Sequence, residues 1–369
     1  MPIAKKNLLV GLDIGSHSVK LVEIIDTKKG KLLQNFGVIG LPQNAVVEGS
    51  IKEMEIVASA VKNLYRNLKL KNKNIATSIS GYSVIVKKIS IDRRDDSELE
   101  SSIHDEAEQY IPFDISDVNL DFEVLEPPAK EPDEDEEDAD KGESEKGEVS
   151  GLMDVMLVAA KKDMVEDYVG LIQLAGLNPV ILDVDAFALQ NAFELAIGEN
   201  RGCFALVNVG AEELGINAVK DGVSIFTRDS SYGGAQITEA IMNNFSVSFE
   251  EAEKIKLGGV ATEEQKTALE EIFTNVISGW GQEIKRALDF LASTYPDESI
   301  EKLYVSGGSI RIPGFRKYLE LETELPVEEL NPFANLQINE KVFDPKYLTY
   351  MGPQAAVAVG LALRSIGDK

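Results

Sequence analysis

The chain has 369 residues, 44% of them hydrophobic, so it is long enough for two or more compact units with sizeable cores. Its formal net charge of −26 excludes the broad basic surface that binds nucleic acids or a bare anionic membrane. The single cysteine, Cys203, excludes an intramolecular disulfide, which suits a reducing compartment. The sequence has neither a signal-like start nor a run of about 18 apolar residues, so we expect a cytoplasmic protein without direct membrane insertion.

The first eighty residues alternate between strand and helix patterns. Residues 8–12, 19–25 and 35–42 are typical of strands, as are residues 74–79 and 83–89, with Gly81 at the turn between the last two. Residues 51–68 predict a helix, because six apolar side chains recur along one stripe. These are Ile56, Val57, Ala60, Val61, Leu64 and Leu68.

Residues 84–182 have the pattern of a smaller unit. A strand at 84–91 precedes a helix whose apolar residues recur at helical spacing; these are Leu99, Ile103, Ala107 and Tyr110. Strands at 119–125 and 153–160 and a helix at 163–175 follow, and Gly176 ends that helix.

An acidic segment, residues 126–151, separates the two later strands of this unit. Its part 131–148 holds eleven acids and two lysines, a net charge of −9. A segment so polar buries too little surface to order itself, so we expect a disordered hairpin loop. Whether it also recruits a basic partner stays open.

The second half repeats the opening pattern. LLVGLDIGSHSVKLVEI at 8–24 and FALVNVGAEELGINAV at 204–219 are both strand, glycine turn and strand, which indicates an internal duplication. A helical block at 235–295 follows. Then LYVSGGSIRIPGF at 303–315 leads a third strand into Gly307 and Gly308, and the chain finishes with a helix of small residues.

The glycine turns are candidates for phosphate binding, because short side chains let several backbone N–H groups approach an anion. Asp13 ends the first strand, where it suits a hydrated Mg²⁺, and the Ser16 and Ser18 hydroxyls and the Lys20 ammonium are near. A single turn of this kind is more often a plain hairpin. The second turn, residues 208–210, and the Gly-Gly turn after a third strand favour the phosphate interpretation.

Residues 248–256 begin a helix in which Ser248 and Glu251 fit a capping box. Glu253 and Lys256 lie three residues apart, so they share a face and suit a ribose and an adenine edge; a surface ion pair is the alternative. The chain has two histidines, His17 and His104, far apart, and neither a P-loop nor a serine-hydrolase elbow. Zinc enzymes and hydrolase triads are therefore excluded.

These segments, in this order, resemble the actin/Hsp70/hexokinase ATPase superfamily and, within it, the FtsA-like PilM family of type IV pilus assembly. The resemblance covers nearly the whole chain except the acidic insertion. Its carrying segments are GLDIGSHSVKLVEI, LPQNAVVEGSI, YIPFDISDVNLDFEVL, LDVDAFALQNAFE, LVNVGAEELGINAVKDGVSIFTRDSSYGGAQITEAI, SFEEAEKIK and LYVSGGSIRIPGF.

The resemblance implies an α/β, actin-like ATPase fold with two duplicated lobes and an inserted FtsA-type small α+β domain. The first lobe would comprise residues 1–83 and 183–202, and the inserted module residues 84–182. The second lobe would comprise residues 203–369, with a helical subdomain at 232–300 on the nucleotide side.

The resemblance also implies a site for ATP and Mg²⁺. The first phosphate loop would be Asp13, Gly15, Ser16, His17, Ser18 and Lys20, and the second Asn208, Gly210 and Ala211. Gly307, Gly308 and Ser309 would border the adenosine, with Glu253 and Lys256 at the ribose and adenine, and Asp13 would hold the metal through water.

Two departures from active ATPases predict weak or absent turnover. Asn208 stands where these enzymes usually offer an aspartate, so it brings no charge to Mg²⁺. Asp185, at the water-activating position, is one methylene shorter than the usual glutamate or glutamine. We therefore expect the nucleotide to clamp two lobes together rather than to drive repeated hydrolysis.

The implied partner is the N-terminal cytoplasmic tail of a PilN-like inner-membrane protein, which would hold this protein peripherally at the inner membrane; self-association is a further expectation. A groove between the first lobe and the module would take the peptide, with Ile85 and Ile89 as candidates, although both equally fit a core.

An FtsA-like filament-forming ATPase and a small-molecule kinase are the alternatives. Against a kinase, the sequence has no recognisable sugar-binding segment. The last residues, VAVGLALRSIGDK, lack the amphipathic membrane helix of FtsA, and the length leaves no room for an Hsp70 substrate domain.

Overall fold

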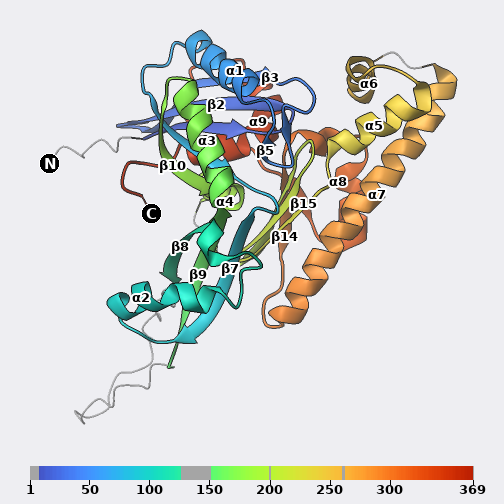
Figure 1. Cartoon of the computed structure of the whole chain (residues 1–369). Helices are drawn as coiled ribbons and strands as arrows, with labels where there is room; N and C mark the ends of the chain where they lie inside the picture. The colour runs from blue at the N-terminus through green and yellow to red at the C-terminus, as the bar shows by residue number, and fades with distance from the viewer. Residues whose placement is uncertain (1–7, 126–150, 199–200, 260–261, 369) are drawn as a thin grey trace. The chain divides into compact units, whose positions relative to one another are not determined.

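The computed structural model describes residues 8–125, 151–198, 201–259 and 262–368. The chain forms two compact units (Figure 1). The main unit comprises Met1–Ser83 and Asp163–Lys369, and the small unit comprises Val84–Lys162.

The first half of the main unit builds a five-stranded sheet in the order β10-β6-β1-β2-β3. Its strands are β1 (Val10–Ile14), β2 (Ser18–Thr27), β3 (Gly30–Gly40), β6 (Asn74–Ile79) and β10 (Asn178–Val184). β1, β2 and β3 are antiparallel neighbours, whereas β6 runs parallel to β1 and to β10. The strands expected from the opening pattern are therefore confirmed.

A short pair of strands and one helix connect β3 to β6. They are β4 (Val46–Val47), β5 (Ser50–Ile51) and α1 (Met54–Asn67). The predicted stripe of α1 is wrong at Ile56, which is 43% exposed. The helix begins only at Met54, so Ile56 lies in its first turn, and the buried face runs instead through Val57, Ala58, Ala60, Val61 and Leu64.

The second sheet has the order β13-β12-β11-β14-β15. Read from its β3 edge, the first sheet is β3-β2-β1-β6-β10, so in both sheets three hairpin strands are followed by two crossover strands. This shared order confirms the internal duplication. Its strands are β11 (Cys203–Val209), β12 (Leu214–Lys220), β13 (Val223–Ser230), β14 (Lys302–Ser306) and β15 (Val327–Glu329). β11 corresponds to β1, because each is the central strand and pairs with an antiparallel hairpin partner and a parallel crossover strand.

Two helices, α4 (Asp185–Ile197) and α9 (Pro345–Leu361), share one core with side chains from both sheets. The core includes Val22 of the first sheet and Leu206 of the second, each fully buried. Close approach needs small residues here: a Cβ on Gly360 of α9 would overlap the carbonyl of Ala188 in α4.

The other face of the second sheet is covered by α5 (Gly234–Phe245), α7 (Glu263–Thr294) and α8 (Phe315–Thr323), with α6 (Phe249–Lys256) beside α5 (Figure 1). Trp280 of α7 is fully buried there, and its indole N–H donates to Gln236 Oε1 at 2.8 Å. In the described part of 235–295, the expected helical block consists of α5, α6 and α7. A 3₁₀ turn, η2 (Gly308–Arg311), follows β14.

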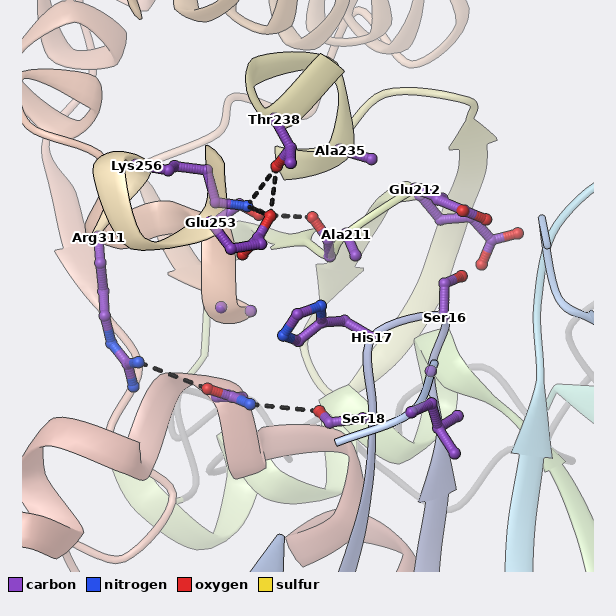
Figure 2. A pocket seen from close by; sticks show the side chains of 18 of the residues that line it. Ser16, His17, Ser18, Ala211, Glu212, Ala235, Thr238, Glu253, Lys256 and Arg311 are labelled. Atoms are coloured by element: carbon purple, nitrogen blue, oxygen red, sulfur yellow. Dashed lines mark hydrogen bonds and ion pairs between the residues drawn. The ribbon is translucent and has the colours of Figure 1, made fainter. Parts of the chain in front are cut away.

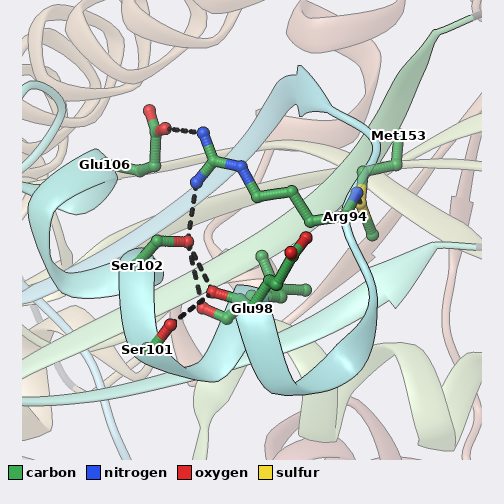
Figure 3. A network of polar contacts seen from close by, with 7 residues as sticks. Arg94, Glu98, Ser101, Ser102, Glu106 and Met153 are labelled. Atoms are coloured by element: carbon green, nitrogen blue, oxygen red, sulfur yellow. Dashed lines mark hydrogen bonds and ion pairs between the residues drawn. The ribbon is translucent and has the colours of Figure 1, made fainter.

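The small unit is a three-stranded antiparallel sheet, β7-β9-β8, with one helix packed on it. Its elements are β7 (Val84–Asp92), α2 (Asp96–Ala107), the 3₁₀ turn η1 (Ile115–Asp117), β8 (Val118–Leu125) and β9 (Leu152–Lys161). Arg94 fixes α2 to the end of β7 by bonds of 2.6 Å to Ser102 Oγ and to Glu106 Oε1 (Figure 3). The acidic residues 126–150 lie outside the described residues.

The small unit ends at Lys162, whereas the sequence pattern extended it to residue 182. The reason is tertiary: β10 pairs with β6 of the main sheet, and α3 (Lys162–Leu174) from Asp163 onward also belongs to the main unit. Tyr168 of α3 donates its hydroxyl to the Gly49 carbonyl at 3.0 Å. Among the described helices, none combines the length and apolar character needed to cross a bilayer.

Candidate functional site

A cavity of about 790 Å³ lies in the main unit, and both sheets contribute to its walls. The turns at the ends of β1, β11 and β14 line it, together with residues of α5, α6 and α9 (Figure 2). Ligand sites for compounds of nucleotide size commonly have volumes of about 300–1,000 Å³. Every predicted nucleotide-site residue, including Asp185, lies on this wall.

The first glycine turn is closed by its own backbone. Gly15 N–H donates to the Ser18 carbonyl at 3.1 Å, and Asp13 and Lys20 face each other in the β1–β2 register. Lys20 Nζ lies 3.1 Å from Asp13 Oδ2, and each side chain is 12% exposed. The turn therefore presents a carboxylate, an ammonium and two hydroxyls together.

His17 points into the cavity from this turn (Figure 2). Burial lowers the pKa of His17 below its usual 6.5, and although Glu253 acts in the opposite direction, Lys256 and Lys20 add to the lowering. The imidazole is then neutral at pH 7, with one donor and one acceptor nitrogen.

The second glycine turn is held to the helix that follows it. Gly210 N–H donates to the Glu213 carbonyl at 2.8 Å, while Gly234 N–H donates to the Gly210 carbonyl at 3.1 Å. Asn208 Oδ1 accepts from Ser306 Oγ at 3.2 Å, so its side chain is oriented by β14. Its register partner on β12 is Gly215, so the ion pair of the first turn has no counterpart at this position.

Glu253 and Lys256 form the ion pair that their spacing allows, with 2.5 Å between Nζ and Oε1. Thr238 of α5 joins them: it accepts from Lys256 Nζ at 2.9 Å and donates to Glu253. The pair nevertheless faces the cavity, with side chains 12% and 15% exposed, and is not a solvated surface pair (Figure 2). Ser248 accepts from the Glu251 N–H, which is one half of the expected capping box.

The Gly-Gly turn approaches other backbone closely. Gly307 has φ of +95°, and a Cβ there would overlap the carbonyl of Val209. Ser309 Oγ donates to the Gly210 carbonyl at 2.6 Å, so the third turn is fastened to the second.

Sequence reasoning missed two side chains that link these turns, Arg311 and Gln354. Arg311 stacks on Tyr350, 3.9 Å from the ring centroid, and donates to Gln354 Oε1 at 3.4 Å. Gln354 Nε2 in turn donates to Ser18 Oγ at 3.4 Å, and Figure 2 shows Arg311 and Ser18 at the two ends of this chain of contacts. The sequence offered a signal for Arg311, because this residue comes shortly after the Gly-Gly turn. It offered no signal for Gln354, which lies within α9.

Three acids, Asp185, Glu213 and Asp229, together line a small second cavity, and the first two of them also line the large one. Burial, and then the charge of Asp13, raises the pKa of Asp185 to about 7. Burial and the neighbouring Asp229 and Asp185 raise the pKa of Glu213 to about 8, and burial raises that of Asp229. Sequence reasoning found Asp185 and missed the other two.

The donor set fits a hydrated magnesium ion better than a caged metal. In the described part of the chain, no group of three or more His, Cys, Asp or Glu side chains has metal-binding geometry. Mg²⁺ usually keeps several waters and binds through one or two carboxylates together with substrate phosphates. Asp13, beside the first turn, can supply one such carboxylate.

The two partner-binding candidates differ in exposure. Ile89 is 4% exposed and packs in the core of the small unit, so its side chain offers no surface to a peptide, and that candidate is corrected. Ile85 is only partly buried beside the same core and keeps an accessible side.

Comparison with known proteins gives a family and a fold. A family model described as "Type IV pilus assembly protein PilM" matches residues 11–139 and 143–366. The solved "PilM-PilN type IV pilus biogenesis complex" is 28% identical, with a TM-score of 0.83 over 98% of this chain and 100% of that one.

More distant structures share the fold alone. The ethanolamine utilization protein EutJ from Carboxydothermus hydrogenoformans is 17% identical, with a TM-score of 0.55 over 98% of this chain and 90% of that one. MreB5 of Spiroplasma citri, solved with ADP, is 11% identical, with a TM-score of 0.50 over 96% and 94%. The α/β architecture is therefore that of the actin-like ATPases. Because the family model spans most of its length, the chain belongs to the PilM family of type IV pilus assembly proteins.

Proposed function

We propose that this protein is an ATP-binding scaffold of the type IV pilus inner-membrane assembly complex, and that it docks the N-terminal cytoplasmic tail of a PilN-like membrane protein. The observation that carries the partner is the likeness, over the full length of both chains, to a PilM solved as a PilM–PilN complex. The protein would then work in the cytoplasm, held at the inner membrane by that partner.

The cavity supports the nucleotide half of the proposal. Its two equivalent glycine turns offer backbone N–H groups and short side chains to phosphates, and Lys20 supplies a cation beside the first turn. Asp13 would hold Mg²⁺ through water, and the metal would neutralise phosphate charge. Glu253 and Lys256, on the cavity wall beyond the turns, suit the ribose and the base, and Arg311 adds a planar cation near Gly308 and Ser309.

The same residues support binding with weak turnover. Asn208 brings an amide and no charge to the second turn. Asp185 is one methylene shorter than the glutamate or glutamine usual at this position, so its carboxylate reaches less far toward an attacking water. We propose that nucleotide binding holds the halves of the main unit together and that hydrolysis is slow.

Isothermal titration of Mg-ATP into the full-length protein, with and without a peptide of the partner's tail, tests the proposal. We expect micromolar ATP binding that Asp13→Ala abolishes, because this variant removes the carboxylate that would hold the metal. Asp26→Ala is the matched control, since Asp26 pairs with Lys31 at 3.0 Å on the neighbouring β2–β3 hairpin but does not line the cavity. Equal ATP binding by both variants would contradict the phosphate-loop assignment.

The peptide tests the partner half separately. We expect the tail peptide to bind the wild type and to bind Ile85→Asp more weakly, with ATP affinity unchanged. Failure of every variant, including the wild type, to bind the peptide would remove the scaffold role and leave the nucleotide site standing.

A further inference from the structure

Two carboxylates from the second half of the main unit hold one turn of the first half. Glu213, beyond the second glycine turn, accepts from Ser80 Oγ at 2.7 Å. Asp229, on β13, accepts from the Gly81 N–H at 2.9 Å. Ser80 and Gly81 follow β6 in the first sheet, so these two bonds join residues more than 130 positions apart in sequence.

The turn is shaped around these carboxylates. Gly81 has φ of +84°, and a Cβ there would overlap Glu213 Oε1. Glycine at this position therefore permits both the left-handed backbone and the close approach of Glu213.

The neighbouring contacts between the two halves are more exposed. Glu48 N–H donates to Glu212 Oε2 at 2.8 Å, and Ser231 Oγ donates to Glu48 Oε1 at 2.6 Å, both at exposed positions. The Ser80–Glu213 and Gly81–Asp229 bonds are part-buried. A hydrogen bond shielded from water costs more to break, because its groups are not freely rehydrated, so the two part-buried bonds carry more of the association.

The Ser80–Glu213 and Gly81–Asp229 bonds, here called the clamp, adjoin the nucleotide cavity. Ser80 and Glu213 line the large cavity, and together with Asp229 they also line a small one of about 20 Å³, shared with Asp185 and Asn208. Any movement that separates the two halves must break the clamp and open this end of the site.

The charge of Glu213 suits a position beside phosphates. Burial first, and then the charges of Asp229, Asp185 and Glu212, raise the pKa of Glu213 to about 8, so it is mostly protonated at pH 7. A neutral carboxylic acid still accepts the Ser80 bond through its carbonyl oxygen and adds no negative charge next to a polyphosphate.

We propose that Glu213 and Asp229 are positioning residues that hold the two halves closed over a bound nucleotide and so set how fast the nucleotide leaves. This inference rests on the nucleotide binding proposed above. Neither residue needs to contact the nucleotide, because both act through the Ser80–Gly81 turn.

The test is the release rate of a fluorescent ATP analogue with Mg²⁺ from the full-length protein, measured by stopped flow against excess unlabelled ATP. We expect Glu213→Ala to speed release about fivefold, as loss of one hydrogen bond predicts. Glu213→Gln keeps the acceptor and the neutral charge, so its release should stay within about twofold of the wild type. A merely structural role would not produce this rescue in the release rate.

Ser80→Ala removes the donor and leaves every acid in place, so it tests the clamp even where Glu213→Ala folds poorly. We expect it to speed release as Glu213→Ala does, and the double variant to be no faster than either single one, since all break the same bond. Glu271→Gln, on the exposed face of α7 and away from the cavity lining, is the control for charge.

Three results would overturn the inference. Wild-type release rates in both Glu213→Ala and Ser80→Ala would remove the clamp while nucleotide binding stands. Release from Glu213→Gln as fast as from Glu213→Ala would do the same, since the neutral acceptor would not suffice. No binding of the analogue by the wild type would remove the proposed function, and the clamp with it.

Discussion

Asp13 and Asn208 occupy equivalent places, each the last residue but one of the central strand of its sheet. The duplication has kept the strand and the glycine turn in both halves but has kept the carboxylate in only one. Asp13 is opposed by Lys20, whereas Asn208 is opposed by Gly215. Of the two equivalent strand positions, only the one on the first sheet therefore carries an ion pair.

The raised pKa of Glu213 predicts how the stability of the nucleotide-free protein depends on pH. Its pKa rises from 4.5 to about 8 on folding, so the folded state binds a proton that the unfolded state releases. The stabilisation is complete below pH 4.5, declines as the pH rises above that value, and is lost once the pH has risen through about 8. We expect the free energy of unfolding, from urea denaturation, to fall between pH 5 and 8 more steeply in the wild type than in Glu213→Gln.

The difference in slope should approach one proton, or about 1.4 kcal/mol per pH unit, in the middle of that window. Glu271→Gln is the control: it removes an exposed carboxylate away from the cavity and should keep the wild-type slope. Identical slopes in the wild type and Glu213→Gln would mean that Glu213 is ionised in the folded protein.

Helix α9 packs closely against backbone on two sides. Its small residues let it lie against α4 on one side and β1 on another: Gly11 of β1 faces Ala358 and Ala362, and Gly360 faces Ala188. Apolar small residues thus act here as spacers that let backbones approach, while larger side chains such as Phe193 of α4 fill the core beside them.

Gly360→Ala should therefore destabilise the protein by about 1–3 kcal/mol, because the new Cβ forces α9 away from α4. Gly170→Ala in α3 is the matched control, since nothing lies within 4 Å of a Cβ there. We expect that variant to be neutral or stabilised by up to about 1 kcal/mol, from better helix propensity. Chemical denaturation measures both, and equal effects at the two sites would contradict the close packing of α9.

We expect Mg-ATP to stabilise the two compact units unequally. Every residue of the large cavity lies in the main unit, so Mg-ATP should stabilise that unit first, by about 2.7 kcal/mol at one hundred times the dissociation constant. Hydrogen exchange should slow at the amides of the glycine turns, residues 15–18, 210–212 and 307–309. It should change little in β7 and β9 of the small unit. Slowing in β7 and β9 with none at the turns would place the nucleotide elsewhere.

Local sequence pattern was enough for most of the elements and for the glycine turns. Strands β1, β2, β11 and β12 were predicted because each is an apolar run next to a glycine turn in the sequence. The repetition of this strand–turn–strand unit implied the duplicated sheets. The same turns carried the nucleotide-site residues from Asp13 to Lys20, which all lie on one cavity wall.

Contacts between distant residues could not be read from that pattern. The exposure of Ile56, the burial of Ile89 and the assignment of β10 to the main sheet depend on which surfaces meet after folding. Glu213 and Asp229 read as ordinary acids in a turn and a strand until the fold brings Ser80 and Gly81 against them. Hydrophobic periodicity and turn chemistry are properties of neighbouring residues, whereas a buried carboxylate takes its partner and its pKa from residues that only the folded chain places beside it.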